Sequence, residues 1–309
     1  MLFYDKLDNI SISEDTAVCI GNFDGLHLGH RLIISSLKEE AKKLGLKTLI
    51  LSFCPHPVQF FGGGLKLIST DRKRMSLFES QEVDYLVYLD FNTYLAGLSP
   101  EEFFKKILID ELHGKLVLVG NDYRFGAKKS GDINTLHELG LKYGIRTIFI
   151  DKVKDSNNIE ISSTRIRNLI ISGDVYYAGK LLGCPYSLEG IVVHGDKNGR
   201  KLGYPTMNIE SANQLTAKDG VYAAKVKIFD KIYNSMAYIG ERPTIDNNLK
   251  RRVEANLFDF NQEVYGSFAE IYLYKYIRDD MKFNTLDELK EQLKKDKEQC
   301  IEVLSHIDL

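Results

Sequence analysis

One stretch of ten residues constrains this chain more than any other, and it reads GNFDGLHLGH from Gly21 to His30. The apolar run 16–20 before it is typical of a buried strand, and the apolar positions of 31–44 recur at helical spacing. We therefore expect a strand, a tight loop and the start of a helix. Gly21 and Gly25 let the loop turn sharply and approach a ligand, and the N–H groups and dipole of a helix start attract anions. The stretch predicts an anion site.

Two histidines close this stretch. His27 and His30 are three residues apart, so on a helix they face the same side, and Gly29 between them allows a phosphate chain to lie close. Two imidazoles in this arrangement are suited to gripping a triphosphate. Histidines at this spacing more often form a metal pair or part of a surface, and it is the order of strand, loop and helix that favours phosphate here.

The first half of the chain continues as alternating strands and helices. Strand-like runs occupy 47–53, 83–89, 115–119 and 145–150, and helical patterns occupy 71–80 and 100–112. This alternation predicts a parallel α/β sheet, whose ligands usually bind at the carboxyl ends of the strands. A helical tail is expected over 172–182, where Gly183 and Pro185 end it.

The pattern changes in the second half. Strand-like segments follow one another at 187–193, 220–229, 231–239, 254–260 and 268–277, and only 285–303 returns to helix. Consecutive strands favour a small closed or half-closed antiparallel barrel. We therefore predict two domains, 1–182 and 183–309. The terminal helix is expected to bury Leu286, Leu289, Leu293 and Val303.

Composition excludes several classes of protein. The chain of 309 residues has 44% hydrophobic and 27% charged residues, without an apolar run of membrane-spanning length or a secretory signal at its start. A net charge of −2 gives no general basic field for nucleic acid. The four cysteines are scattered and are expected to be buried, reduced thiols. We expect a cytoplasmic protein with small-molecule partners, no nucleic-acid or membrane partner, and a monomeric or weakly homo-oligomeric state.

Three further loops in the first half carry side chains suited to ligand binding. CPHPVQFFGGG begins at Cys54, GNDYRFGAKKSGD begins at Gly120, and ISSTRIR begins at Ile161. They offer a rigid turn around a histidine, aromatic rings with cations, and hydroxyls with two guanidinium groups at a helix start. Each has a plain explanation as a turn, a solvated basic loop or an N-cap at Ser162 or Ser163. Together with the histidines, they predict a phosphate clamp with two halves.

The second half has one informative loop, HGDKNGRKLGYPTMN from His194 to Asn208. Its glycines and its cations are suited to wrapping phosphates through backbone N–H groups, although a plain hairpin turn explains them nearly as well. The continuation GYPTMN carries a hydroxyl and an amide, which are hard oxygen donors of the kind Mg²⁺ prefers.

These motifs resemble those of a known enzyme family. GNFDGLHLGH is similar to the FMN adenylyltransferase branch of the nucleotidyltransferases that carry HxGH on a Rossmann-like sheet. The PHP segment, SSTRIR and GNDYRFG match the same branch, with Tyr123 in place of the commoner Phe. GYPTMN resembles the PTxN signature of riboflavin kinase, with Met207 in place of Ala, and IGERPTI and YIRDDMKF follow the kinase pattern. The whole chain is similar to the bacterial bifunctional riboflavin kinases/FAD synthetases.

The resemblance implies an adenylyltransferase site in the first half. His27 and His30 are implied to be catalytic. The other residues implied to bind ATP are Gly21, Asn22, Phe23, Asp24, Ser163, Thr164, Arg165 and Arg167. Those implied to contact the flavin are His56, Pro57, Asp122, Tyr123 and Arg124.

It also implies a riboflavin kinase barrel with its own site in the second half. Thr206 and Asn208 are implied to bind Mg²⁺ with ATP, and Glu254 is implied to be the base for the 5′-hydroxyl of the ribityl chain. The other residues implied to bind ATP are Gly195, Lys197, Gly199, Arg200 and Gly203.

The function so implied is to phosphorylate riboflavin to FMN and then to adenylylate FMN to FAD with release of pyrophosphate, using ATP and Mg²⁺. A nucleotidyltransferase for another phosphorylated substrate would share HxGH but has no use for the kinase half. An aminoacyl-tRNA synthetase also uses an HxGH-like clamp but needs a basic surface for tRNA. A flavin-responsive regulatory protein stays open as an alternative, and flavin binding without turnover of ATP would favour it.

Overall fold

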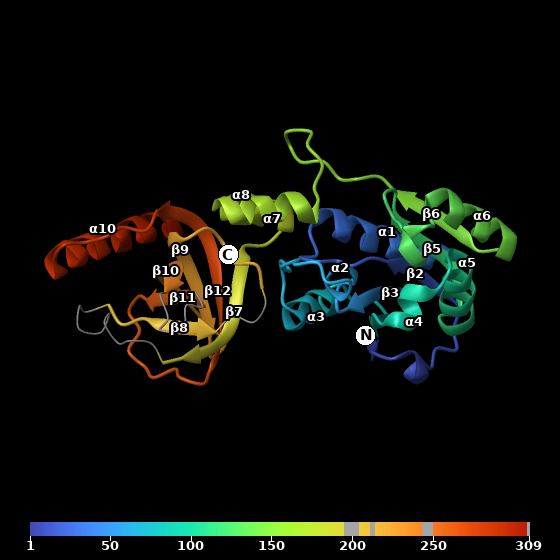
Figure 1. Cartoon of the computed structure of the whole chain (residues 1–309), viewed down its shortest axis with the longest axis horizontal. Helices are drawn as coiled ribbons and strands as arrows, with labels where there is room; N and C mark the ends of the chain where they lie inside the picture. The colour runs from blue at the N-terminus through green and yellow to red at the C-terminus, as the bar shows by residue number, and fades with distance from the viewer. Residues whose placement is uncertain (195–203, 211–213, 243–249, 308–309) are drawn as a thin grey trace. The chain divides into compact units, whose positions relative to one another are not determined.

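The computed structural model describes residues 1–194, 204–210, 214–242 and 250–307 (Figure 1). It forms two compact units. The first comprises 1–65 and 71–162, and the second comprises 66–70 and 163–309. These units follow from packing alone, and the predicted domain boundary between residues 182 and 183 stays a prediction.

The first unit is built on a sheet of six parallel strands. In chain order the strands are β1 (Leu2–Tyr4), β2 (Thr16–Ile20), β3 (Lys47–Cys54), β4 (Tyr85–Asp90), β5 (Gly114–Gly120) and β6 (Arg146–Ile150). In the sheet they are ordered β1-β4-β3-β2-β5-β6, and every neighbouring pair is parallel. The predicted parallel α/β architecture is confirmed, and the edge strand β1 is an addition to the prediction.

Helices connect these strands. They are η1 (Leu7–Asn9), α1 (Leu28–Leu44), α2 (Pro57–Phe60), α3 (Asp71–Glu79), α4 (Thr93–Gly97), α5 (Pro100–Glu102), the π-helix η2 (Phe103–Glu111), η3 (Ala127–Lys129) and α6 (Ile133–Tyr143). The central strand β2 is buried along its whole length, and its alternate residues enter two different hydrophobic clusters. One cluster includes Ile34 and Leu37 of α1, and the other includes Phe104 of η2 and Leu136 of α6. Helices therefore cover both faces of the sheet, as a parallel sheet requires.

The second unit contains a closed barrel of six strands. The strands are β7 (Tyr186–Val193), β8 (Met207–Glu210), β9 (Gly220–Ile228), β10 (Lys231–Arg242), β11 (Lys250–Leu257) and β12 (Phe268–Arg278). They close in the order β10-β11-β8-β7-β12-β9 through antiparallel pairs. The predicted antiparallel barrel is confirmed. Helices α7 (Ser163–Ser172) and α8 (Val175–Leu182) precede it, and α8 packs against β7 and β12.

The terminal helix α10 (Leu286–Ser305) packs on the barrel through Cys300 and Leu304. The prediction that Leu286 is buried was wrong, because this first helical residue is 70% exposed and the buried side of the helix is formed further along it. An ion pair between Arg278 on β12 and Asp296 fixes the helix. Nε of Arg278 lies 2.9 Å from Oδ1 and 3.1 Å from Oδ2 of Asp296, and Nη2 lies 2.7 Å from Oδ2. Asp296 is 1% exposed.

A short segment from the first half of the sequence belongs to the second unit. Within that unit, the carbonyl of Leu67 accepts a hydrogen bond from the Leu215 N–H at 2.8 Å, and the carbonyl of Ile68 accepts one from Gln214 Nε2 at 2.9 Å. The hydroxyl of Thr70 donates to Glu189 on β7. Residues 66–70 are thus held by the second unit, although the residues on either side of them pack in the first.

All four cysteines lie in the described part of the chain, and none forms a disulfide. Cys19 and Cys300 are buried, as predicted, whereas Cys54 and Cys184 are only partly buried. Among the residues that the structure describes, no helix is both long and apolar enough to cross a lipid bilayer.

Candidate active sites

The loop between β2 and α1 has an unusual backbone. Gly25 has φ 80°, and Phe23 and Leu26 also lie in the left-handed region, with φ 48° and 42°. Residues with a Cβ rarely adopt this conformation, which costs free energy unless the surroundings impose it. The side chains of Phe23 and Leu26 are 1% and 0% exposed in the core under α1. Their burial holds the loop in its conformation.

The loop places the two histidines against each other. Helix α1 begins at Leu28, so His27 is its N-cap, and Nδ1 of His27 accepts a hydrogen bond from the backbone N–H of His30 over 3.4 Å. The two rings stack with their centroids 3.6 Å apart and their planes 16° apart. Because Nδ1 of His27 accepts, the neutral ring carries its proton on Nε2.

The His27 ring leaves little room for a side chain at position 29, which explains the glycine there. A Cβ at this position would lie 3.1 and 3.2 Å from Cε1 and Nδ1 of His27. The sequence suggested that this glycine admits a phosphate chain, and the structure shows that it first makes room for the His27 imidazole.

His30 is held in its neutral form. The edge of its ring meets Phe23, with centroids 5.2 Å apart and planes at 75°, and its Nδ1 is buried without a hydrogen-bond partner among the described residues. Burial lowers the pKa of His30 well below its ordinary value, and the neighbouring His27 lowers it further. A buried Nδ1–H would lack an acceptor, so the favoured neutral ring carries its proton on Nε2.

A residue that the sequence did not reveal supports the loop from below. Arg74 on α3 is 0% exposed, and its Nη1 donates to the carbonyl oxygen of Asn22 at 3.3 Å. Arg74 also pairs with Asp71, and its guanidinium lies 5.0 Å from the centre of the Tyr88 ring. Arg74 belongs to the charged run DRKR, and nothing in that run indicates which of its cations is buried.

The residues predicted to contact flavin lie in two loops of the first unit. His56 is buried and caps α2, since its Nδ1 accepts from the N–H of Val58 at 3.1 Å, and Pro57 begins that helix. After them come Phe60 and Phe61, whose rings contact each other and Phe91 with centroids 5.1 to 6.1 Å apart. Phe61 is 68% exposed. This aromatic cluster was not predicted, although the two phenylalanines that follow the PHP turn after two residues were a usable signal.

In the second loop, the Tyr123 ring stacks on Phe125 with centroids 5.6 Å apart, and burial raises the pKa of Tyr123. Arg124 pairs with Asp132, the N-cap of α6, at 2.9 Å, and Asp122 pairs with Lys152 at 3.3 Å. Arg124 therefore has a local structural partner.

Of the ISSTRIR residues, those from Ser163 to Arg167 lie in the second unit, where α7 begins at Ser163 and includes Thr164, whereas Ile161 and Ser162 belong to the first unit. The Arg165 guanidinium lies 5.5 Å from the centre of the Tyr177 ring. Nε of Arg167 donates to the carbonyl of Lys66 at 3.3 Å. That these residues close over ATP opposite the histidines stays a prediction.

The barrel brings together three predicted residues that are far apart in sequence. Oγ1 of Thr206 donates to Oε2 of Glu254 at 2.9 Å, and Glu254 on β11 is the register partner of Asn208 on β8. Arg252 joins them, because its Nε donates to Oδ1 of Asn208 at 2.6 Å and also pairs with Glu254. Arg252 was missed, although residues two apart on a strand share one face. The predicted residues Gly195, Lys197, Gly199, Arg200 and Gly203 lie outside the described residues.

The donor set of this cluster fits Mg²⁺. The Thr206 hydroxyl and the Asn208 amide oxygen are hard donors, and Mg²⁺ commonly completes its shell with substrate phosphates and waters. The described part of the chain contains no group of three or more His, Cys, Asp or Glu residues able to hold a metal by themselves.

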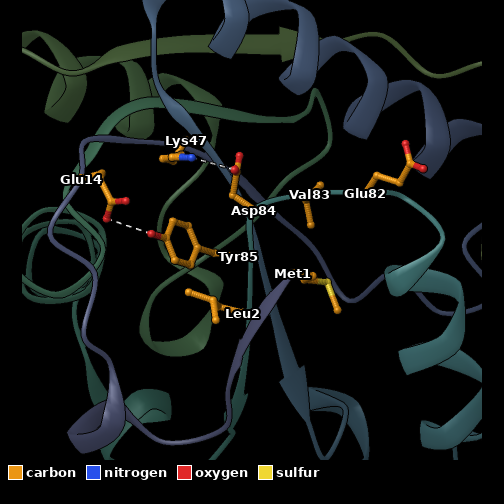
Figure 2. A pocket seen from close by; sticks show the side chains of 8 residues that line it. All are labelled: Met1, Leu2, Glu14, Lys47, Glu82, Val83, Asp84 and Tyr85. Atoms are coloured by element: carbon orange, nitrogen blue, oxygen red, sulfur yellow. Dashed lines mark hydrogen bonds and ion pairs between the residues drawn. The ribbon is translucent and has the colours of Figure 1, made fainter.

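The first unit also has a hollow of about 370 Å³. Figure 2 shows the side chains that line it. It is lined by the amino ends of β1, β3 and β4, where Lys47 pairs with Asp84 at 3.1 Å and Tyr85 donates to Glu14 at 2.8 Å. The histidine loop follows the carboxyl end of β2. The hollow is thus at the opposite edge of the sheet from the candidate site.

Comparison with known proteins identifies a family for each half of the chain. Residues 9–165 match the family described as FAD synthetase, and residues 182–304 match the family described as riboflavin kinase. The chain belongs to the bifunctional riboflavin kinase/FMN adenylyltransferase family. A member from Buchnera aphidicola (Schizaphis graminum) is 39% identical over 92% of this chain and 93% of its own length. A member from Bacillus subtilis is 36% identical over 96% of each chain.

A solved structure has the same fold over nearly the whole length. It is a Streptococcus pneumoniae protein described as a macrolide-efflux protein, 34% identical, with a TM-score of 0.88 over 96% of this chain and 97% of its own. Similarity to family members thus extends across both units.

Proposed function

We propose that this chain catalyses both reactions of its family, converting riboflavin to FMN and FMN to FAD with ATP. The observation that carries the proposal is that one chain holds two separate groups of reactive side chains. The first unit has the stacked His27 and His30 at a helix start, and the second has Thr206, Asn208 and Glu254 on adjoining strands.

In FMN adenylylation, the FMN phosphate attacks the α-phosphorus of ATP and pyrophosphate leaves. The Nε2–H groups of His27 and His30 donate to the phosphate oxygens as charge builds on them, and the N–H groups at the start of α1 add to this. His30 acts as a neutral donor, because burial and the neighbouring His27 lower its pKa. No protein base is needed, since the FMN phosphate is already an anion.

The remaining predicted residues receive roles that agree with their burial. The side chains of Phe23 and Asp24 are buried, so residues Gly21 to Asp24 are proposed to meet ATP mainly through the backbone. The flavin is proposed to bind near His56, Pro57, Asp122, Tyr123 and Arg124. Pyrophosphate is proposed to bind Ser163, Thr164, Arg165 and Arg167, which offer hydroxyls and guanidinium groups.

In riboflavin phosphorylation, Glu254 orients the 5′-hydroxyl and accepts its proton as the hydroxyl attacks the γ-phosphorus of ATP, whose bond to the β-phosphate oxygen breaks to release ADP. Thr206 and Asn208 are proposed to hold Mg²⁺ with ATP, and the ion supplies charge neutralisation on the phosphates. The loop with Gly195, Lys197, Gly199, Arg200 and Gly203 is proposed to wrap the nucleotide. We further propose a cytoplasmic location and a monomeric or weakly homo-oligomeric state.

The test is a time course of the purified protein with riboflavin, ATP and Mg²⁺, in which riboflavin, FMN and FAD are separated by chromatography. We expect FMN to rise first and FAD to follow. His30→Ala should abolish FAD formation and leave FMN formation largely intact, and Glu254→Gln should do the reverse. Loss of both activities from either change in a folded protein would contradict two separate sites, and bound flavin without any conversion would favour the regulatory alternative.

A further inference from the structure

Arg252 has contacts that the proposed kinase reaction does not use. It lies on β11 two residues before Glu254, and its side chain is 24% exposed. Nε of Arg252 donates to Oδ1 of Asn208 at 2.6 Å and also pairs with Oε1 of Glu254. The guanidinium therefore lies between the amide oxygen proposed to hold the metal and the carboxylate proposed to accept the substrate proton.

A guanidinium in this position competes with a divalent cation in two ways. It uses the same oxygen of Asn208 that the metal would coordinate, and two positive charges within a few ångströms repel each other in a partly buried site. It also engages Glu254, whose other oxygen accepts the Thr206 hydroxyl at 2.9 Å. With both contacts in place, each carboxylate oxygen already has a partner that competes with a substrate hydroxyl.

We propose that Arg252 competes with the metal for this cluster. Its side chain must leave Asn208 and Glu254 before a metal–nucleotide complex binds productively. The inference rests on the proposed kinase site. It assigns to Arg252 a positioning role, in which its side chain sets how strongly the cluster binds the metal. The opposite role, a support that holds Asn208 and Glu254 in place for the metal, predicts the opposite effect of removing it.

The test is Mn²⁺ binding to the full-length protein with ADP, followed by loss of the free-ion signal in electron paramagnetic resonance. Arg252→Met should tighten Mn²⁺ binding about tenfold. This factor is a modest part of the repulsion that one unit charge exerts on a divalent cation a few ångströms away. Arg252→Lys keeps the charge and should stay within about threefold of the unchanged protein, since the competition is mainly electrostatic. The Mg²⁺ concentration for half-maximal FMN formation should fall in Arg252→Met as well.

Asn208→Ala separates this site from metal–nucleotide binding elsewhere in the chain. In that background Arg252→Met should have no effect on Mn²⁺ binding, and near-ultraviolet circular dichroism of the barrel tyrosines checks that each variant is folded. Weaker or unchanged Mn²⁺ binding in a folded Arg252→Met would overturn the inference and leave the kinase site standing. If Asn208→Ala itself leaves Mn²⁺ binding unchanged, the proposed metal site fails and the inference fails with it.

Discussion

Replacing Asp296 by Ala should destabilise the second unit by about 3 kcal/mol, because it leaves the positive charge of Arg278 without its carboxylate. Removing one partner of a buried ion pair typically costs about 3–5 kcal/mol, and the lower end applies because the Arg278 side chain is 17% exposed. Three contacts to Arg278 and one from Gln292 at 2.8 Å are lost together. A unit of this size loses about 2–4 °C of melting temperature per kcal/mol, so we expect a decrease of about 6–12 °C.

The measurement is differential scanning calorimetry of the full chain, with urea unfolding followed by tyrosine fluorescence. The unfolding transition of the second unit should move to lower temperature, and FMN formation should be lost over the same range. The matched control is the double variant Arg278→Met, Asp296→Leu, which removes both charges and should recover most of the loss. A loss below about 1 kcal/mol in Asp296→Ala, or no recovery in the double variant, would refute the view that α10 is fixed by a desolvated charge pair.

Three further predictions concern the histidine loop. Because the pKa of His30 is lowered in the folded state, the unfolded chain binds the proton more readily. The free energy of unfolding should therefore be at its full value above about pH 6.5 and fall below that pH by at most about 1.4 kcal/mol per pH unit. Urea midpoints measured across pH should show this slope in the unchanged protein and a flatter one in His30→Gln. Arg74→Met removes the hydrogen bond to the carbonyl of Asn22 and should lower kcat/KM for FMN adenylylation about 10- to 100-fold. FMN formation should be unchanged, and Arg74→Lys should recover part of the adenylylation rate. An unchanged adenylylation rate in Arg74→Met would show that Arg74 does not support the loop. Gly29→Ala pushes the His27 ring and should reduce FMN adenylylation by a similar factor. Thermal unfolding should show no loss of stability, because alanine favours the helix. Equal adenylylation rates in the variant and the unchanged protein would mean that the ring moves aside at no cost.

The sheet could be predicted from sequence because its strands are buried on both faces. Such strands read as unbroken apolar runs, and β2 was predicted with the bounds it has. Strands β1 and β8 were not predicted, because three and four residues are too few to show a strand-like hydrophobic pattern. Leu286 was misjudged because periodicity shows which side of a helix is apolar, and not at which residue the helix first meets the barrel.

The candidate sites were predicted as residue types at given places, and their partners were not. Thr206 and Glu254 were both chosen from motifs, and only strand register shows that they meet. Arg124 was predicted as a flavin contact, and its pairing with Asp132 depends on how a loop folds back on a helix start. Charged side chains such as Arg74 and Arg252 acquire their roles from tertiary contacts between segments, which no local pattern encodes.

The segment 66–70 has a consequence for how a protein of this kind can evolve and be engineered. The chain passes from one unit to the other at 65/66, at 70/71 and at 162/163, so a single cut cannot separate the two units cleanly. A fragment that begins at Ser163 lacks the hydrogen bonds that Leu67, Ile68 and Thr70 supply to Leu215, Gln214 and Glu189. Recombination between two homologues at one crossover point near 162 would pair the barrel of one parent with the segment of the other. Exchange of the two activities between homologues therefore requires that residues 66–70 travel with the barrel.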